Sequence, residues 1–155
     1  MSKTNQLREI ERKFLLKRLP GDLSGFAHAE IEQGYLAIEP GIQVRLRKKG
    51  SERFLACKRG NRHAREEREV RLSAEQFDAL WPATEGRRLS KIRYDVPCGE
   101  FVAELDVYTG RHEGVVVVEV EFPDETSCDG FVPPDWFGEE VTGQSRYSNV
   151  VMAQQ

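Results

Sequence analysis

The sequence predicts a mainly β protein with a few helices packed outside, in which eight antiparallel strands close into a hollow barrel. Eight segments alternate apolar and polar residues with a period of two, which is typical of strands with one apolar face. Most are separated by short turns such as Pro40-Gly41 and Lys48-Lys49-Gly50-Ser51, so consecutive strands pair as hairpins. The polar side of these segments is almost wholly charged. Together these features favour a barrel or a strongly curved sheet.

Length and composition narrow the class of protein. The chain has 155 residues without a linker, repeat or low-complexity tract, so we expect a single domain over residues 1–155. Its net charge is only -3, which implies no nucleic-acid partner, and no apolar run is long enough to span a membrane. Three widely spaced cysteines (Cys57, Cys98 and Cys128) fit reduced thiols, and residues 1–8 lack the apolar core of a signal peptide. We expect a cytoplasmic protein.

The expected strands follow from the alternation. They cover Glu9–Leu16, Ala29–Ile38, Ile42–Arg47, Arg53–Lys58, Arg65–Leu72, Arg87–Val96, Phe101–Tyr108 and Val115–Phe122. Ser73 and Gln76 have the spacing of a capping box, and Phe77 and Trp81 share a face of a helix over residues 73–81. Residues 129–144 contain Pro133-Pro134, and we expect a loop with a short helix there.

The first strand illustrates how charges are distributed. Ile10, Phe14 and Leu16 fall on one face, and Glu9, Glu11 and Lys13 fall on the other. The same parity places a large ionic set opposite the apolar residues of the later strands: Arg45, Arg47, Lys58, Glu67, Glu69, Lys91, Arg93, Glu104, Asp106, Glu119 and Glu121. Uncharged polar residues are nearly absent from this face.

Parity alone leaves two interpretations open. Antiparallel sheets commonly keep one face in water, and a charged face is then ordinary. Alternatively the sheet closes, the apolar face lies outside under the helix at 73–81 and the C-terminal segment, and the charged face lines a cavity. Buried ion pairs rarely repay their desolvation cost, so an ionic lining indicates a ligand rather than a stabilising device. An eight-stranded barrel is just wide enough for a small ligand.

The two signs of charge indicate two ligands. Guanidinium and ammonium groups bind phosphate oxygens, and the guanidinium fork does so bidentately. Clustered carboxylates suit hard cations such as Mg²⁺ or Mn²⁺, which accept carboxylate and phosphate oxygens together. Both sets in one cavity predict a tunnel that binds a metal–polyphosphate complex.

The order of these motifs resembles the CYTH family of triphosphate tunnel metalloenzymes over nearly the whole chain. The resemblance rests on this succession: Glu9-x-Glu11-x-Lys13, Gln33-Gly34-Tyr35-Leu36, Arg45-x-Arg47, Lys58, Glu67-x-Glu69, Lys91-x-Arg93-Tyr94, Glu104-x-Asp106, Glu119-x-Glu121 and Arg146-Tyr147-x-Asn149. The first motif is weak alone, and the succession makes it specific. The family's fold is an eight-stranded antiparallel tunnel, which agrees with the parity argument.

The resemblance implies a role for each matching residue. Lys13, Arg45, Arg47, Lys58, Lys91 and Arg93 would bind triphosphate oxygens, and Glu9, Glu11, Glu119 and Glu121 would bind Mg²⁺ or Mn²⁺. Glu67, Glu104 and Asp106 would support them by orienting bases, metal or water. Catalytic roles are implied for Glu69 or Glu121 as proton acceptor and for Tyr35 with Lys13 as an acid/base pair. Tyr35 could equally be a hydrogen-bonded residue of the barrel wall.

The implied activity is hydrolysis of inorganic triphosphate to diphosphate and phosphate, with a small-molecule substrate as the partner. Alternatives within the same fold are a class IV adenylate cyclase and a hydrolase of organic triphosphates such as thiamine triphosphate. A sensor that binds polyphosphate or nucleotides without turnover is the alternative outside enzymes, although a pure binder has no need of the carboxylates. The sequence leaves the oligomeric state open, and a homodimer is one option.

Overall fold

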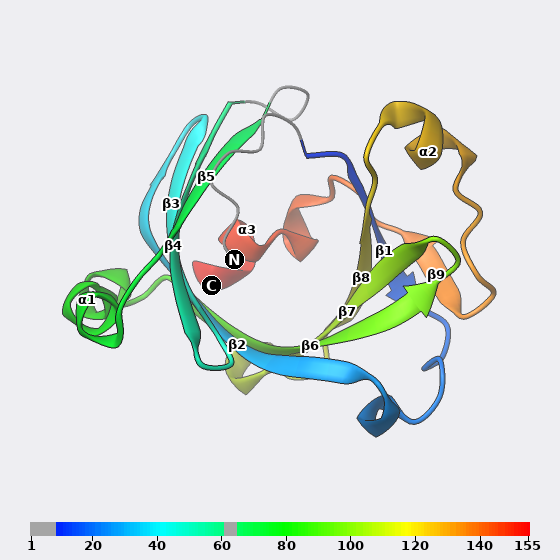
Figure 1. Cartoon of the computed structure of the whole chain (residues 1–155), viewed down its shortest axis with the longest axis horizontal. Helices are drawn as coiled ribbons and strands as arrows, with labels where there is room; N and C mark the ends of the chain where they lie inside the picture. Colours follow the sequence, from blue (N-terminus) through cyan, green and yellow to red (C-terminus); the bar gives the residue numbers. More distant parts are fainter. Residues whose placement is uncertain (1–8, 61–64) are drawn as a thin grey trace.

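The computed structural model describes residues 9–60 and 65–155, and one antiparallel sheet dominates them (Figure 1). The strands run in the order β5-β4-β3-β2-β6-β7-β8-β1-β9. Their bounds are β1 Glu11–Leu16, β2 Ala27–Glu39, β3 Ile42–Lys49, β4 Glu52–Arg59, β5 Glu66–Arg71, β6 Arg88–Cys98, β7 Phe101–Thr109, β8 Val116–Glu121 and β9 Phe137–Glu140. All eight expected strands are present, with ends that differ from the prediction by at most two residues.

The predicted eight-stranded closed barrel is wrong in strand number and in closure. The sheet has nine strands, and its terminal strands β5 and β9 each pair with one neighbour among the described residues. Figure 1 shows the sheet curling around α3, with β5 and β9 lying apart from each other. The additional strand β9 lies within the expected loop at 129–144. It pairs with β1 through Phe14–Glu140 and Leu16–Phe137, and four residues are too few to show an alternation.

Strand β2 is the longest strand of the described sheet and contains an irregularity. It is 13 residues long and pairs with both β3 and β6. A register shift between Tyr35 and Ala37 marks an irregularity of the kind that bends and twists a strand. Just before it, Gly34 lies against Thr84 of the 3-10 helix η2 (Trp81–Thr84), and a Cβ on Gly34 would be 2.7 Å from Thr84 Cβ. Only glycine fits there.

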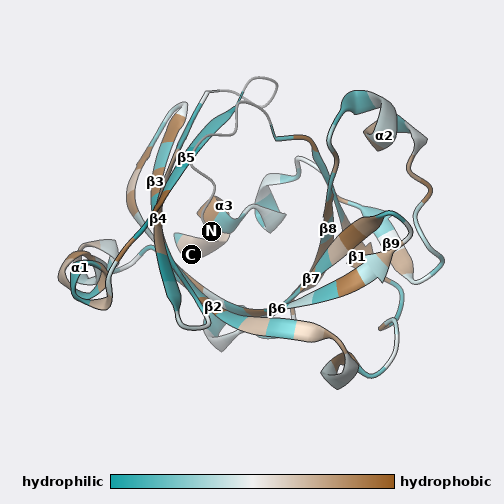
Figure 2. Ribbon diagram, in the orientation of Figure 1, coloured by the Kyte–Doolittle hydropathy of each residue, from teal (hydrophilic) through white to brown (hydrophobic). Residues whose placement is uncertain are grey.

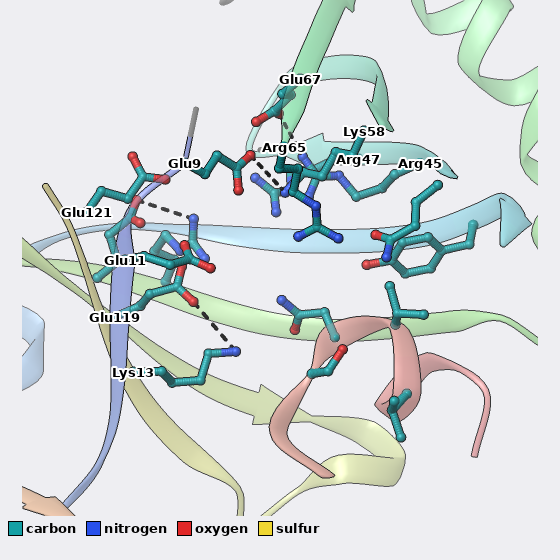
Figure 3. A pocket seen from close by; sticks show the side chains of 18 of the residues that line it. Glu9, Glu11, Lys13, Arg45, Arg47, Lys58, Arg65, Glu67, Glu119 and Glu121 are labelled. Atoms are coloured by element: carbon teal, nitrogen blue, oxygen red, sulfur yellow. Dashed lines mark hydrogen bonds and ion pairs between the residues drawn. The ribbon is translucent and has the colours of Figure 1, made fainter. Parts of the chain in front are cut away.

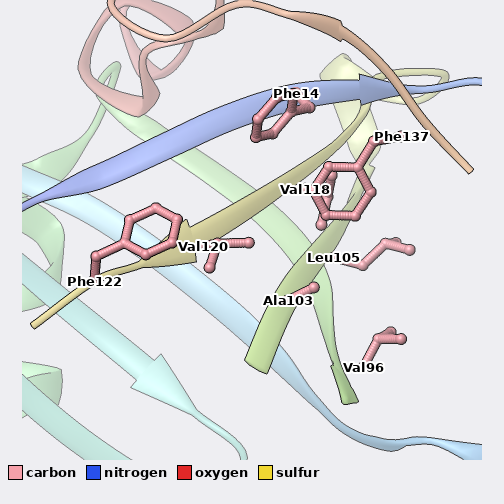
Figure 4. Close-up of a cluster of buried hydrophobic side chains, with 8 residues drawn as sticks. All are labelled: Phe14, Val96, Ala103, Leu105, Val118, Val120, Phe122 and Phe137. Atoms are coloured by element: carbon pink, nitrogen blue, oxygen red, sulfur yellow. The ribbon is translucent and has the colours of Figure 1, made fainter. Parts of the chain in front are cut away.

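The outer face of β1, β6, β7 and β8 carries the main apolar core. Hydrophobic and hydrophilic residues alternate along the strands (Figure 2), and the apolar ones form a cluster of buried side chains (Figure 4): Phe14, Val96, Ala103, Leu105, Val118, Val120, Phe122 and Phe137. Helix α2 (Glu125–Gly130) and the chain after it cover this cluster, and Phe131 packs on Phe14 and Phe122. The expected apolar outer face is confirmed.

Helix α1 (Ala74–Leu80) begins where the capping box predicts. Gln76 N donates to Ser73 Oγ at 3.1 Å, and Ser73 N donates to Gln76 Oε1 at 2.9 Å. Phe77 is buried and stacks on Trp81. The α-helix ends at Leu80, and the chain continues through Pro82 as the 3-10 helix η2. Short 3-10 helices also occur at Leu23–Gly25, Gly110–His112 and Ser145–Tyr147.

The C-terminal helix α3 (Asn149–Ala153) lies inside the curve of the sheet, which corrects the expectation that the C-terminal segment covers the outer face (Figure 1). Its Met152 and Ala153 are buried in a second apolar cluster with Tyr35, Tyr108 and Val117. Apolar residues therefore also occur on the concave face, at the end that α3 covers. None of the helices in the described part of the chain is long and apolar enough to cross a membrane.

Candidate active site

The concave face and the chain from Val141 to Val151 enclose a cavity of about 740 Å³. Its walls contain every predicted site residue except Lys91 and Asp106, namely Glu9, Glu11, Lys13, Tyr35, Arg45, Arg47, Lys58, Glu67, Glu69, Arg93, Glu104, Glu119 and Glu121. These side chains come from strands β1 to β8 and the residues next to them, so strand parity places them on one face and the curl of the sheet brings them together. The charged face therefore points inward, into a cavity of a size suited to a small ligand.

The carboxylates gather on one side of the cavity (Figure 3). Antiparallel pairing of β1 with β8 puts Glu11 opposite Glu121 and Lys13 opposite Glu119. Glu11 and Glu119 are hydrogen bonded to each other, and burial together with the charge of Glu119 raises the pKa of Glu11 to about 9. Burial alone would raise the pKa of Glu119, but Lys13 and the hydrogen bond with Glu11 lower it. At neutral pH the two carboxyl groups therefore share one proton.

This carboxylate set fits a divalent cation that also takes oxygen atoms from a substrate. Burial raises the pKa of Glu9 and that of Glu104 even though Lys58 and Arg93 lie beside them, so a further positive charge would favour their ionisation. As the described side chains stand, no three His, Cys, Asp or Glu residues form a ready-made metal cage. Mg²⁺ is usually held by one or two carboxylates plus phosphate oxygens rather than by an all-protein cage. The Glu11–Glu119 pair matches that requirement.

The opposite wall is basic (Figure 3). Arg45 NH2 lies 3.5 Å from Glu67 Oε1, and Lys58 Nζ lies 3.3 Å from Glu9 Oε1. Burial and the charges of Arg45 and Arg93 lower the pKa of Arg47 to about 9. Arg45 Nε is buried without a hydrogen-bond partner among the described residues. These cations repel one another and leave a donor unused, which is the condition a polyanion would relieve.

Lys91, Arg93 and Asp106 form a buried network beside the cavity. Asp106 Oδ2 lies 2.7 Å from Lys91 Nζ, and Arg93 donates to both Asp106 oxygens at 2.8 and 2.9 Å. Burial lowers the pKa of Lys91 to about 7, whereas Arg93 and Lys91 outweigh burial and lower the pKa of Asp106. Arg93 still lines the cavity. Lys91 lies beneath α3 instead, within 3.4 Å of Asn149 Oδ1, which also accepts from the Tyr108 hydroxyl.

Lys13 and Tyr35 both line the cavity but have different partners. Lys13 Nζ donates to the Tyr147 carbonyl oxygen at 2.9 Å and lies 3.5 Å from Glu119 Oε2. The Tyr35 hydroxyl accepts from Gln33 Nε2 at 2.9 Å. No direct hydrogen bond joins Lys13 to Tyr35 within the described residues.

Sequence reasoning did not assign a role to three features of the site. Gln33 shares the parity of Tyr35 and bridges it to Arg47, and Arg65 adds a further cation to the cavity wall. Parity could have found both residues. The chain from Val141 to Val151 closes one side of the cavity, and its contacts carry no periodic signal that a sequence could reveal.

The fold and the mixed ionic lining define the CYTH class of triphosphate tunnel proteins. The crystal structure of an inorganic triphosphatase has a TM-score of 0.73 and 40% identity, over 97% of each chain. A candidate adenylate cyclase from Bacillus halodurans has a TM-score of 0.64 over 82% of this chain and 86% of its own. At 18% identity, that likeness shows the fold alone. No protein-family model matches the chain.

Two relatives identify the family more closely. The chain is 45% identical over 149 residues to an inorganic triphosphatase from Nitrosomonas europaea, covering 94% of this chain and 96% of the relative. It is 32% identical over 151 residues to an inorganic triphosphatase from Acetivibrio thermocellus, covering 92% and 90%. The chain belongs to the inorganic triphosphatase family.

Proposed function

We propose that this protein hydrolyses inorganic triphosphate to diphosphate and phosphate with Mg²⁺ or Mn²⁺ as its cofactor. The observation that carries the proposal is a single cavity in which buried and half-buried cations face a group of largely half-buried carboxylates. Both relatives named above are inorganic triphosphatases, which supports the same substrate class. The free thiols of Cys57, Cys98 and Cys128 support a reducing, cytoplasmic location.

The basic residues would bind the phosphate chain. An extended triphosphate can contact several cations of the cavity wall at once. These cations are Lys13, Arg45, Arg47, Lys58 and Arg93. Glu67 holds Arg45, and Glu104 and Asp106 hold Arg93, so these acids support the cations rather than the substrate. Lys91 does not line the cavity, so it would affect substrate binding through Asp106 and Arg93.

The cation would be held by Glu9, Glu11, Glu119 and Glu121. When bound, it would polarise the scissile phosphoryl group and position water. Glu11 and Glu119 release their shared proton when they ionise. Glu69 and Glu121 line the cavity on β5 and β8 and are the candidate acceptors of the water proton. The cations of the opposite wall would stabilise negative charge that develops on the leaving diphosphate.

The test is to incubate the protein with triphosphate, ATP or thiamine triphosphate plus Mg²⁺ or Mn²⁺. Phosphate, diphosphate and cyclic AMP are then measured. We expect equal amounts of phosphate and diphosphate from triphosphate, released only when metal is present. Cyclic AMP from ATP, faster turnover of an organic triphosphate, or binding without turnover would each replace the proposal with one of its alternatives.

Glu11→Gln tests the metal assignment within the same assay. We expect metal-dependent phosphate release to fall by at least about 100-fold, because the substituted amide cannot supply a carboxylate charge. Glu100→Gln removes an exposed carboxylate from the β6–β7 turn and serves as the matched control. Full activity of Glu11→Gln would show that the cation is held elsewhere.

A further inference from the structure

Gln33 links two residues of the cavity wall although it does not line the cavity itself. Its side chain is completely buried on β2, directly opposite Arg47 on β3. Arg47 Nε and NH2 donate to Gln33 Oε1 at 2.9 and 2.8 Å. On its other side, Gln33 Nε2 donates to the Tyr35 hydroxyl at 2.9 Å. One neutral amide therefore contacts both Arg47 and Tyr35.

The chemistry of arginine determines which way this amide points. A guanidinium has only donors, so the atom of Gln33 that faces Arg47 must be the oxygen. The amide nitrogen then faces Tyr35, and because it is a donor the phenol oxygen must accept. The phenol keeps its own proton for another partner, and no acceptor for that proton occurs among the described residues. Tyr35 lines the cavity, where a phosphate oxygen could accept it.

The neutrality of Gln33 matters for Arg47. Arg45 and Arg93 are ion-paired with Glu67 and Asp106, so part of their charge is offset within the protein. Arg47 is held instead by an uncharged amide, which fixes the guanidinium without neutralising it. A bidentate guanidinium held in this way is suited to a phosphate group.

We propose that Gln33 is a positioning residue that makes Tyr35 a hydrogen-bond donor to bound triphosphate and aims Arg47 at the same ligand. The inference rests on the proposed triphosphate hydrolysis and refines it. Tyr35 then stabilises charge on a phosphate oxygen, and the acceptor of the water proton is a carboxylate such as Glu69 or Glu121.

Gln33→Glu reverses the hydrogen bond to Tyr35. The carboxylate can still accept from Arg47, but it has no donor, so the phenol proton turns toward Glu at position 33 and away from the cavity. We expect kcat to fall by about 10- to 100-fold, as is typical when a group that orients a catalytic site is altered. Tyr35→Phe should cause a comparable loss of kcat, and combining the two should lower kcat no further, because both remove the same donor. The charge that Gln33→Glu adds beside Arg47 should instead raise KM.

Gln33→Met separates the second role from the first. Methionine has a similar length but no oxygen, so Arg47 loses its acceptor while the phenol proton stays free. We expect KM for triphosphate to rise by about 10-fold with a smaller change in kcat. Glu32→Gln, at an exposed position next to Gln33 on β2, is the control and should leave both constants unchanged.

A spectroscopic measurement tests the inference without using activity. The tyrosine doublet in the Raman spectrum distinguishes a phenol that accepts from one that donates, and subtracting the spectrum of Tyr35→Phe isolates Tyr35. The doublet should shift toward a donating phenol in Gln33→Glu. An unchanged doublet, or losses of kcat that multiply in the double variant, would overturn the role of Gln33. Failure of wild-type protein to hydrolyse triphosphate would overturn the proposed function instead.

Discussion

Lys91 and Asp106 form a buried ion pair, with 2.7 Å between Lys91 Nζ and Asp106 Oδ2. The pair lies beneath α3, whose Asn149 side chain lies within 3.4 Å of Lys91 Nζ. Arg93 contacts the other side of Asp106, so two buried cations share this carboxylate, and Arg93 has a second, longer contact with Glu104. Since Arg93 also lines the cavity, this network links the C-terminal helix to the site.

Asp106→Asn should destabilise the protein strongly. The amide leaves two buried cations without their shared carboxylate, and breaking a buried pair costs about 3–5 kcal/mol. The pKa of Asp106 is lowered in the folded state, because Arg93 and Lys91 outweigh burial. The stabilisation is therefore fully present above the unfolded-state pKa of about 3.9 and is lost as pH falls through the folded-state pKa. Urea unfolding over a range of pH measures this contribution to the free energy of unfolding.

The comparison of wild type with Asp106→Asn makes this prediction specific. Their difference in unfolding free energy should be largest near about pH 6 and shrink steadily below about pH 4. Asp95→Asn, a partly buried acid on the neighbouring strand β6, is the control and should show a much smaller difference. A difference that does not depend on pH would mean that the Asp106 charge contributes little.

Metal binding should release a proton. The pKa of Glu11 is raised to about 9 by burial and by the neighbouring Glu119, so Glu11 is protonated at neutral pH. A divalent cation needs the ionised carboxylate, so each cation bound should displace about one proton, and affinity should rise with pH up to about 9. Titration calorimetry of Mg²⁺ or Mn²⁺ in buffers of different ionisation enthalpy counts the protons. Equal proton release by Glu11→Gln would contradict the assignment.

The part of the site that the sequence predicted is the part that strand parity determines. Glu119 and Glu121 share a face because they are two residues apart, whatever the rest of the chain does. The prediction of a closed barrel was wrong for a related reason. Alternation tells which residues share a face, but not whether the first and last strands of a sheet meet. β9 was missed because its pairing with β1 depends on backbone contacts between residues far apart in sequence, such as Leu16 and Phe137.

The placement of the C-terminal segment has a similar explanation. Asn149 accepts hydrogen bonds from Tyr108 and Lys91, which come from two different strands. Nothing in the local pattern of residues 145–153 shows that these partners lie on the concave face. Asn149 was part of the motif that carried the family resemblance, but the resemblance alone did not say what it contacts.

Triphosphate should stabilise the folded protein through the basic wall. Bound phosphate oxygens would offset repulsion among Arg45, Arg47 and Arg93 and would give the buried Arg45 Nε an acceptor. A ligand at about 100 times its Kd raises stability by about 2.7 kcal/mol, which appears as a higher Tm. Arg45→Gln should remove most of this shift. Lys48→Gln, at the position between Arg47 and Lys49 whose parity points away from the cavity, should keep it. Equal shifts in the two variants would exclude Arg45 from the binding wall.

Gly34→Ala should destabilise the protein, although alanine is the smallest possible addition. The new Cβ would be 2.7 Å from both Thr84 Cβ and Thr84 Oγ1, and Thr84 is completely buried. Thr84 cannot move away easily, because its hydroxyl donates to Trp81 O and accepts from Arg88 Nε. Overpacking of this kind costs about 1–3 kcal/mol, which urea unfolding would measure.

A compensating substitution distinguishes this clash from a general intolerance of β2 to alanine. Thr84→Gly removes the atoms that the new Cβ meets, so the Gly34→Ala/Thr84→Gly double variant should lose less stability than the two single variants added together. Gly34 lies between Gln33 and Tyr35, so the same clash should also displace the Tyr35 hydroxyl, which faces the cavity. Gly34→Ala should therefore lower kcat for triphosphate, and Thr84→Gly should restore part of it. Strictly additive losses would show that Thr84 does not hold this part of β2 in place.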